Sequence, residues 1–325
     1  MGIAAGARSR QLRQSLTLTR LALASVIVNV VIVVTGGAVR LTQSGLGCPT
    51  FPSCGDGSLI PTRRFGINGI IEFTNRQLTF VVVAVVVATL VVAILDRREV
   101  RLAVLLAASI PAQALLGGLT VLTHLNPWLV AAHFLLSMAI ISVAFTLWWR
   151  VSGHTGPPSS RAIRQGAVLL TGITSLVLAI GTVVTGSGPH AGDADASGKV
   201  HRTGLPVGSV SQLHADVVML LIGVTIGFVL LAQVAGAHRQ LLRAIRLLLA
   251  VELAQGLIGF VQYFTHIPAL LVGVHMFGAC LVWLAALRVL LSSRAAAEPF
   301  GNPNQEEPDV RRSYSPSEAD SPFSS

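Results

Sequence analysis

The sequence has 325 residues, of which 52% are hydrophobic and only 11% are charged, and its mean hydropathy is +0.71. Soluble domains carry roughly 25% charged residues, so this composition excludes an ordinary soluble domain. The net charge of +9 does not indicate a nucleic-acid partner, because the arginines are spread between apolar runs and form no single patch.

Eight apolar runs are long enough to cross a lipid bilayer. A spanning helix needs about 20 apolar residues, and a helix pairs its own backbone polar groups, as hydrocarbon requires. The first run is too long for a signal-peptide core and has no small-residue cleavage site after it, so we interpret it as a retained anchor. We therefore predict an all-α membrane protein with eight transmembrane helices, at residues 21–39, 77–95, 102–123, 128–149, 165–186, 213–235, 244–264 and 269–291.

The basic residues divide unequally between the two ends of these helices. Seventeen arginines lie in the N-terminus, the even-numbered loops and the C-terminal tail, against six arginines and lysines in the other loops. The positive-inside rule then predicts a cell-membrane protein with both termini in the cytoplasm. Residues 1–20 form a cytoplasmic N-terminus in this interpretation. Residues 292–325 are rich in Ser, Pro and Glu, which predicts a disordered cytoplasmic tail.

The first outer loop contains the sequence GLGCPTFPSC, with cysteines at Cys48 and Cys54. The loop faces the oxidising side of the membrane, which favours a disulfide. A crosslink across so short a loop adds little stability, so the bond would either shape the loop or take part in redox chemistry. Cys280, inside the last apolar run, is interpreted as a small packing residue.

A long segment of the chain occurs twice. Residues 113–133 and 255–275 align without a gap at an offset of 142, and eight of the 21 positions are identical. Each copy spans the end of one helix, a short outer turn and the start of the next. With four helices per half, both halves enter the membrane in the same direction. We therefore predict two parallel-related four-helix bundles, residues 21–149 and 165–291, related by a pseudo-twofold axis along the membrane normal.

Three histidines lie within the outer parts of even-numbered helices. At about 1.5 Å per residue, His133 lies roughly 9 Å from Pro127, and His275 roughly 10 Å from Pro268. His214 stands near the head of its helix. A single buried histidine is most often held by an interhelical hydrogen bond. Two imidazoles converging from neighbouring helices favour bis-axial ligation of a haem iron, and zinc is less favoured because it needs a fuller set of ligands.

The first half differs from the second at one of these positions. A looser alignment of the second and sixth helices places Asn75 opposite His214. An amide is a poor haem ligand, so the first half would hold iron with one firm ligand and leave room for a substrate. Glu72 lies one helical turn before Asn75. Such a carboxylate is either solvated at the membrane edge or, above a porphyrin, able to move protons or stabilise a cation.

Further polar residues on the outer side have two interpretations each. Arg40, Arg76 and Arg202 either pair with haem propionates in bidentate fashion or anchor the helices at the interface. His124 and His266 stand in matching Thr-His turns, where they either cap the last carbonyls of a helix or hydrogen-bond a propionate.

Several motifs together resemble one known family. They are GGAVRLTQSGLGCPTFPSC, IEFTNR, QALLGGLTVLT, TGSGPHAGD, the LH of the sixth helix and the GVH of the eighth. Over roughly residues 20–290, in this order and on the expected loops, they resemble the heme A synthase family. The resemblance implies a membrane oxidoreductase that oxidises a ring methyl of heme O to a formyl group. Successive hydroxylations and loss of water would give heme A for an aa3-type terminal oxidase.

The resemblance also implies residue roles. His214 and His275 match the ligands of a haem b in the C-terminal half. His133 and Glu72 match residues of the N-terminal substrate site, where heme O would bind, and the cysteine pair matches that of the family. The family has a histidine where this chain has Asn75, in its E-x-x-H-R pattern. Either His133 alone then holds heme O, or another group such as His124 substitutes.

Further expectations concern the partners of the protein and its alternative functions. The resemblance places the haem sites toward the outer face of the bilayer, with a quinone-linked electron acceptor, a heme O synthase and a homo-oligomer as expected partners. The alternative function is a non-catalytic dihaem b electron carrier, which needs two bis-histidine sites. A haem or small-molecule transporter built on the repeat is a third hypothesis, and it predicts broken helices near the middle of the membrane.

Overall fold

The structure is a computed structural model that describes residues 2–48, 50–54, 66–154, 159–190, 192–193 and 198–294, with side chains from residue 16 onward. Within these ranges the regular structure is entirely helical, and each of eight helices is long and apolar enough to span a membrane. This confirms the predicted fold class. The predicted disordered tail lies outside the described residues from position 295. The helices are α1 (Gly2–Leu41), α2 (Gly66–Leu95), α3 (Val100–Leu122), α4 (Pro127–Val151), α5 (Arg161–Ser187), α6 (Val207–Val234), α7 (Arg239–Phe264) and α8 (Ala269–Ser292).

Several helices begin earlier than hydropathy predicted. Helix α2 begins at Gly66 instead of residue 77, and α6 at Val207 instead of residue 213. The polar residues in these first turns interrupt the apolar run, but they do not interrupt the backbone hydrogen bonds. Some of these side chains turn toward the interior of the protein, as Glu72 does, whereas others such as Gln212 are exposed. Polar positions inside a membrane bundle commonly face such an interior.

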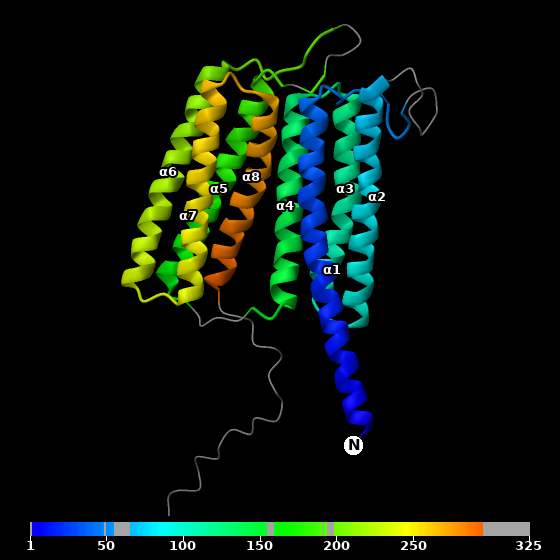
Figure 1. The fold of residues 1–325 in the computed structure, drawn as a ribbon, viewed down its shortest axis with the longest axis vertical. Helices are drawn as coiled ribbons and strands as arrows, with labels where there is room; N and C mark the ends of the chain where they lie inside the picture. The colour runs from blue at the N-terminus through cyan, green and yellow to red at the C-terminus, as the bar shows by residue number, and fades with distance from the viewer. Residues whose placement is uncertain are drawn as a thin grey trace, which may run out of the picture.

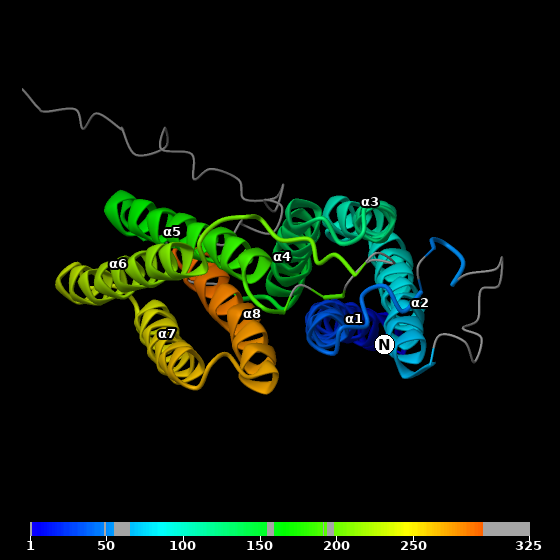
Figure 2. The same cartoon turned by 90° about the horizontal axis from the view of Figure 1, so that it is seen from above.

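The helices form two groups of four, which lie side by side when seen along the helix axes (Figure 2). In each group the consecutive helices are neighbours, and the first helix also packs against the fourth, α1 against α4 and α5 against α8. Between the groups, α4 packs on α5 and α8, and α1 packs on α8. A twofold axis along the helices exchanges the α4–α5 and α1–α8 contacts, as the predicted parallel repeat requires.

The loops that follow odd-numbered helices all lie at one end of the molecule (Figure 1). The start of α1 and the end of α8 lie at the opposite end. The three histidines on α4, α6 and α8 are in the halves of their helices nearest the odd-loop end, since these helices begin there.

The turns α3–α4 and α7–α8 have the same backbone conformation in both halves. His124 and Leu125 have φ values of 53° and 60°, and His266 and Ile267 have values of 62° and 59°. In each turn the second of these residues donates its N–H to a carbonyl of the preceding helix at 2.8 Å. This pattern satisfies carbonyls that the end of a helix leaves free. The sequence repeat is therefore also a repeat of local structure.

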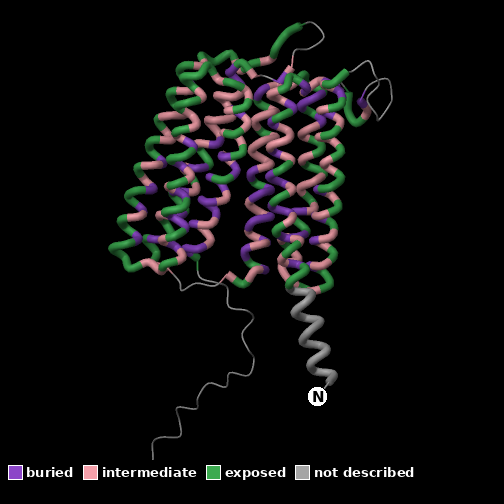
Figure 3. Tube along the Cα trace, viewed as in Figure 1, coloured by how far each residue is buried: buried purple, intermediate pink, exposed green. Residues whose placement is uncertain are grey.

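Buried residues gather on the inward faces of the helices, and exposed apolar residues cover the outward faces (Figure 3). One hydrophobic cluster fills the first half and extends to α8, and a second fills the other half. Trp283 of α8 joins the halves, because its indole N–H lies 2.9 Å from the carbonyl of Met138 and 3.0 Å from the hydroxyl of Ser142 on α4. Cys280 is buried in the first cluster, in agreement with a packing role.

Candidate functional site

One cavity of about 1250 Å³ runs through both halves and is lined by residues from all eight helices. Small-molecule pockets are typically about 300–1,000 Å³, so this cavity has room for a ligand larger than most. Most of the side chains that line it are apolar. Seven of the predicted site residues line it: Arg40, Glu72, Asn75, Arg76, His133, His214 and His275.

Each of the three helix-borne imidazoles packs against a glycine of the preceding helix. A methyl group added to Gly117 or to Gly181 would lie 3.0 or 3.2 Å from the Cε1 atom of the facing ring, closer than ordinary van der Waals contact. Glycine therefore lets each ring lie directly against the neighbouring helix. The pairs are Gly117 with His133, Gly181 with His214, and Gly259 with His275.

A glutamine on the same preceding helix fixes the backbone at two of these histidines. The side-chain amide of Gln113 donates to the carbonyl of His133 at 3.1 Å, and that of Gln255 donates to the carbonyl of His275 at the same distance. These glutamines open the two copies of the repeated segment. Both line the cavity, and sequence reasoning missed their role although the repeat contained the signal.

The imidazoles keep ring nitrogens that no protein group uses. The Nδ1 atoms of His133, His214 and His275 are buried without a hydrogen-bond partner. Buried polar groups are normally paired, and a neutral imidazole is a common ligand of iron. His214 and His275 are also close enough for a charge on one to act on the other. Within the described ranges, no group of three or more His, Cys, Asp or Glu side chains could hold a bare metal ion. The donor set therefore fits haem iron.

Asn75 stands in the first half where His214 stands in the second. The nearest atom to a methyl group added on Gly36 of α1 would be the Asn75 amide nitrogen, at 4.0 Å, much as Gly181 of α5 faces His214. The hydroxyl of Thr35 donates to Oδ1 of Asn75 at 2.8 Å. The amide is thus fixed against α1 and lines the cavity. The helices of the first half present one imidazole to the cavity, and those of the second half present two.

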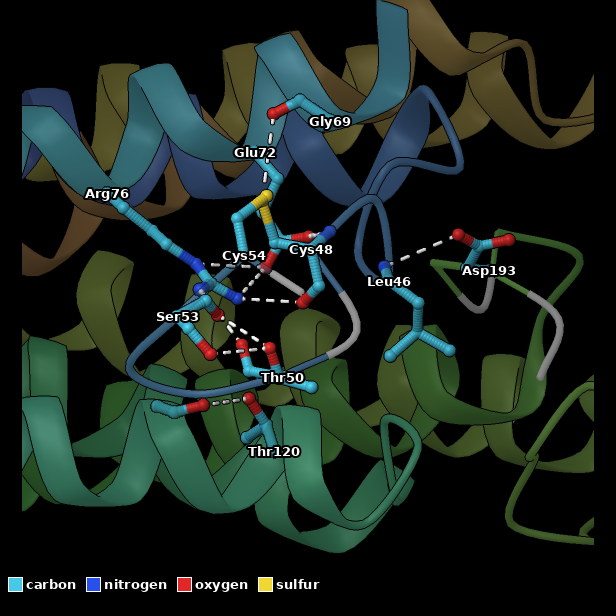
Figure 4. A network of polar contacts seen from close by, with 11 residues as sticks. Leu46, Cys48, Thr50, Ser53, Cys54, Gly69, Glu72, Arg76, Thr120 and Asp193 are labelled. Atoms are coloured by element: carbon cyan, nitrogen blue, oxygen red, sulfur yellow. Dashed lines mark hydrogen bonds and ion pairs between the residues drawn. A yellow bond between two sulfur atoms is a disulfide. The ribbon is translucent and has the colours of Figure 1, made fainter. Parts of the chain in front are cut away.

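Glu72 and Arg76 hold the cysteine-containing loop against α2 (Figure 4). Glu72 is only 5% exposed, which excludes the interpretation of a solvated carboxylate at the membrane edge. Its Oε2 atom accepts the backbone N–H of Cys48 at 2.6 Å, and its Oε1 atom forms an ion pair with Arg76. The predicted disulfide between Cys48 and Cys54 is present. Sequence reasoning placed these residues in one region and missed that they form one network.

The guanidinium of Arg76 also donates to the carbonyls of Cys48, Thr50 and Ser53, at 2.9, 3.1 and 3.2 Å. Nε and both terminal nitrogens therefore have acceptors within the protein. The immediate effect of Arg76 is to fix the loop and the orientation of Glu72 at the mouth of the cavity.

Arg40 connects the two halves at the same end. Its Nε atom donates to the carbonyl of His190 at 2.6 Å and its Nη2 atom to the carbonyl of Thr185 at 2.9 Å. His190 in turn places its Nε2 atom 2.9 Å from the carbonyl of Ile267 in the α7–α8 turn. Arg40 thus joins the end of α1 to the segment after α5 above the cavity.

The remaining predicted residues lie away from the cavity. Arg202 is exposed in the α5–α6 loop. His124 and His266 are exposed in their turns, and His124 stacks on His201 with ring centroids 6.3 Å apart. None of the three is among the residues that line the cavity. Their predicted roles in binding propionates therefore have no support from this arrangement.

Replacing Arg76 by alanine is expected to destabilise the loop. Loss of one partner from a buried ion pair costs about 3–5 kcal/mol, and the 22% exposure of the Arg76 side chain puts this case at the lower end. Thermal unfolding in detergent should begin at lower temperature, and amides 44–54 should exchange faster with deuterium. Arg150→Ala is the control, because Arg150 forms an exposed pair with Glu99 worth about 1 kcal/mol or less. Equal effects of the two substitutions would contradict this assignment.

The fold and the cavity define a multi-pass membrane protein with two related four-helix halves around a large internal ligand site. A family model described as cytochrome oxidase assembly protein, COX15-CtaA, matches residues 59–287. The chain belongs to this family, the heme A synthase family, and acts in cytochrome oxidase assembly. No curated protein matches the chain.

Proposed function

We propose that the protein is a heme A synthase, which oxidises a ring methyl of heme O to a formyl group and so supplies heme A to an aa3-type oxidase. The observation that carries this proposal is that the two halves present different polar side chains to the cavity. One cavity receives two helix-borne imidazoles from the second half but only one from the first, where Asn75 stands at the position that matches His214. A pair of haem sites with different ligand sets suits one resident cofactor and one substrate.

In the second half, His214 and His275 would hold haem b, which supplies one-electron transfer when bound. A pair of histidine ligands suits a haem that carries electrons. Gly181 and Gly259 leave the space that these rings need beside their helices. Gln255 donates a hydrogen bond to the backbone carbonyl of His275, which holds this part of α8 in place before the cofactor binds.

In the first half, His133 would be the protein ligand of the substrate heme O. Asn75 is held by Thr35, and an amide is a poor iron ligand, so this half would bind its haem less firmly than the other half, as suits a substrate. Glu72 is fixed by Arg76 and by the N–H of Cys48 at the mouth of the cavity. From there its carboxylate would take up a proton released at the reacting methyl carbon, or stabilise positive charge there. The positive charges of Arg40 and Arg76 would favour the propionates at this end.

The expected orientation places both termini in the cytoplasm and the mouth of the cavity toward the outer face of the cell membrane, because arginines are concentrated at the opposite ends of the helices. Heme O is lipid-soluble enough to arrive within the membrane, from a heme O synthase. The expected electron acceptor is quinone-linked.

The test is the haem content of a strain that lacks the gene. Membranes of the deletion strain should contain heme O and no heme A, as identified by extraction, chromatography and mass spectrometry. The wild-type gene supplied in trans should restore heme A. Normal heme A in the deletion strain would refute the proposal. It would favour the non-catalytic dihaem carrier, although that alternative requires a second axial imidazole where Asn75 stands.

A further inference from the structure

A second carboxyl group is buried in the cavity, on the opposite half from Glu72. Glu252 lies in α7, twelve residues before the end of the helix at Phe264. At about 1.5 Å per residue, this places it roughly 18 Å below the mouth of the cavity, near the middle of the membrane. The residue is 3% exposed and lines the cavity. The preceding account of the reaction does not use it.

No positive charge accompanies this carboxyl group. Its Oε2 atom is buried without a hydrogen-bond partner. The ion pairs Glu72–Arg76 and Glu99–Arg150 do not include it. An ionised carboxylate in such surroundings costs several kcal/mol, and a group in this position instead neutralises its charge.

The hydrogen bonds around Thr225 indicate how the charge is neutralised. The Oγ1 atom of Thr225 lies 2.9 Å from the carbonyl of Leu221 and 3.0 Å from Oε1 of Glu252. A hydroxyl group has one proton to donate. With Glu252 ionised, that one proton would serve two acceptors, whereas a proton on the carboxyl group lets both contacts be full hydrogen bonds. The arrangement accommodates a protonated Glu252, and burial with an unpaired Oε2 atom favours it.

The matched positions of the first half show that bundle packing does not require this pair. The offset of the repeated segment places Ile110 opposite Glu252, and the alignment of Asn75 with His214 places Val86 opposite Thr225. Ile110 and Val86 also line the cavity, so the equivalent place in the first half is apolar. The carboxyl–hydroxyl pair belongs only to the half that presents two imidazoles.

We propose that Glu252 and Thr225 form a proton-binding site within the membrane. Glu252 holds a proton on Oε1, donated to Thr225, and exchanges it with water that enters the cavity. The site compensates changes of charge at the group held by His214 and His275. Glu252 keeps its proton while that group is reduced. When the group passes one electron to an acceptor and gains a positive charge, Glu252 releases one proton to water in the cavity, and it takes a proton up again when a reductant returns the electron. This compensation rests on the proposed function, whereas the protonation of Glu252 does not.

Other titratable groups near α7 are accounted for. Helices α6 and α8 pack against α7. On α6, Asp216 is exposed and accepts a hydrogen bond from Gln212. On α8, Cys280 is buried in the cluster of the first half, and Arg288 lies two helical turns farther toward the other end of the bundle. The helix-borne groups that share the cavity with Glu252 in this half are His214, His275 and Tyr263.

Infrared spectroscopy of the purified full-length protein tests the protonated carboxyl group. The wild-type protein, kept reduced at neutral pH, should show the C=O band of a protonated carboxylic acid, and Glu252→Gln should lose it. Glu99→Gln is the matched control and should keep the band, because Glu99 is paired at the surface. Thr225→Val should keep the band at a shifted frequency, since it removes the hydrogen-bond partner only. A spectrum in which Glu252→Gln and Thr225→Val both leave this region unchanged would overturn the proposal.

Redox titration of the haem at several pH values tests the compensation. The midpoint potential should fall with rising pH in the wild type and in Glu99→Gln, and this dependence should be lost or flattened in Glu252→Gln. An unchanged pH dependence in Glu252→Gln would overturn the compensation. Absence of any haem would refute the proposed function and leave the infrared result as the test of the proton site.

Discussion

Replacement of His275 by alanine is expected to leave the purified protein without haem b. The imidazole lines the same cavity as His214 and has an unpaired Nδ1 atom, and the substitution removes it without disturbing the glutamine that binds the backbone carbonyl. Loss of residues that only support a metal ligand costs about 10–100-fold in affinity, so loss of the ligand should cost at least as much. Haem b content per protein, measured by the pyridine haemochrome spectrum, should fall accordingly.

His266→Ala is the matched control for this experiment. His266 lies on the same half, nine residues before His275, but is exposed in the α7–α8 turn and does not line the cavity. Its substitution should leave the haem b content unchanged. Imidazole added to the His275→Ala protein should restore part of the spectrum, because the substitution leaves space for it. Full haem retention by His275→Ala would remove the ligand pair on which the proposed function depends.

The number of helices and the depth of the histidines were predictable from the sequence because both depend on local pattern. Apolar runs of bilayer length define the spans, and the rise per residue converts the distance from Pro127 or Pro268 into a depth. The repeat could be found because two copies of one turn keep the same residues. The early starts of α2 and α6 were missed because polar residues lower the local hydropathy even where, as at Glu72, the side chain is buried within the protein.

The contacts between distant segments were not predictable in the same way. Arg76 was interpreted as a ligand of propionates or as an anchor, but its guanidinium donates hydrogen bonds to the carbonyls of Cys48, Thr50 and Ser53. Only the folded loop brings these carbonyls together, and no property of residue 76 indicates them. Glu252 was overlooked for a related reason. It is a single acidic residue in an apolar run, and its significance depends on Thr225, which lies on another helix.

Replacement of His133 by alanine is expected to impair the substrate site of the first half and to leave the haem b site of the second half intact. The substitution lies in the first half, so the protein should keep its haem b but should produce much less heme A. In a deletion strain that expresses His133→Ala, heme O should accumulate as in the strain without the gene, and heme A should fall roughly tenfold or more, since a lost ligand costs at least that factor. Haem extraction from membranes and the spectrum of the purified variant measure the two effects separately.

His124→Ala distinguishes the two ways in which the first half could hold its substrate. One interpretation of the sequence was that His124 replaces the missing second ligand. The ring is exposed, stacks on His201 and is absent from the lining of the cavity. We therefore expect His124→Ala to produce heme A normally, which also makes it the matched control for His133→Ala. If His124→Ala abolished heme A while His133→Ala retained it, the substrate iron would be bound from the turn and not from α4. Loss of haem b in His133→Ala would show instead that the halves do not bind haem independently, and the assignment of one cofactor site and one substrate site would fail.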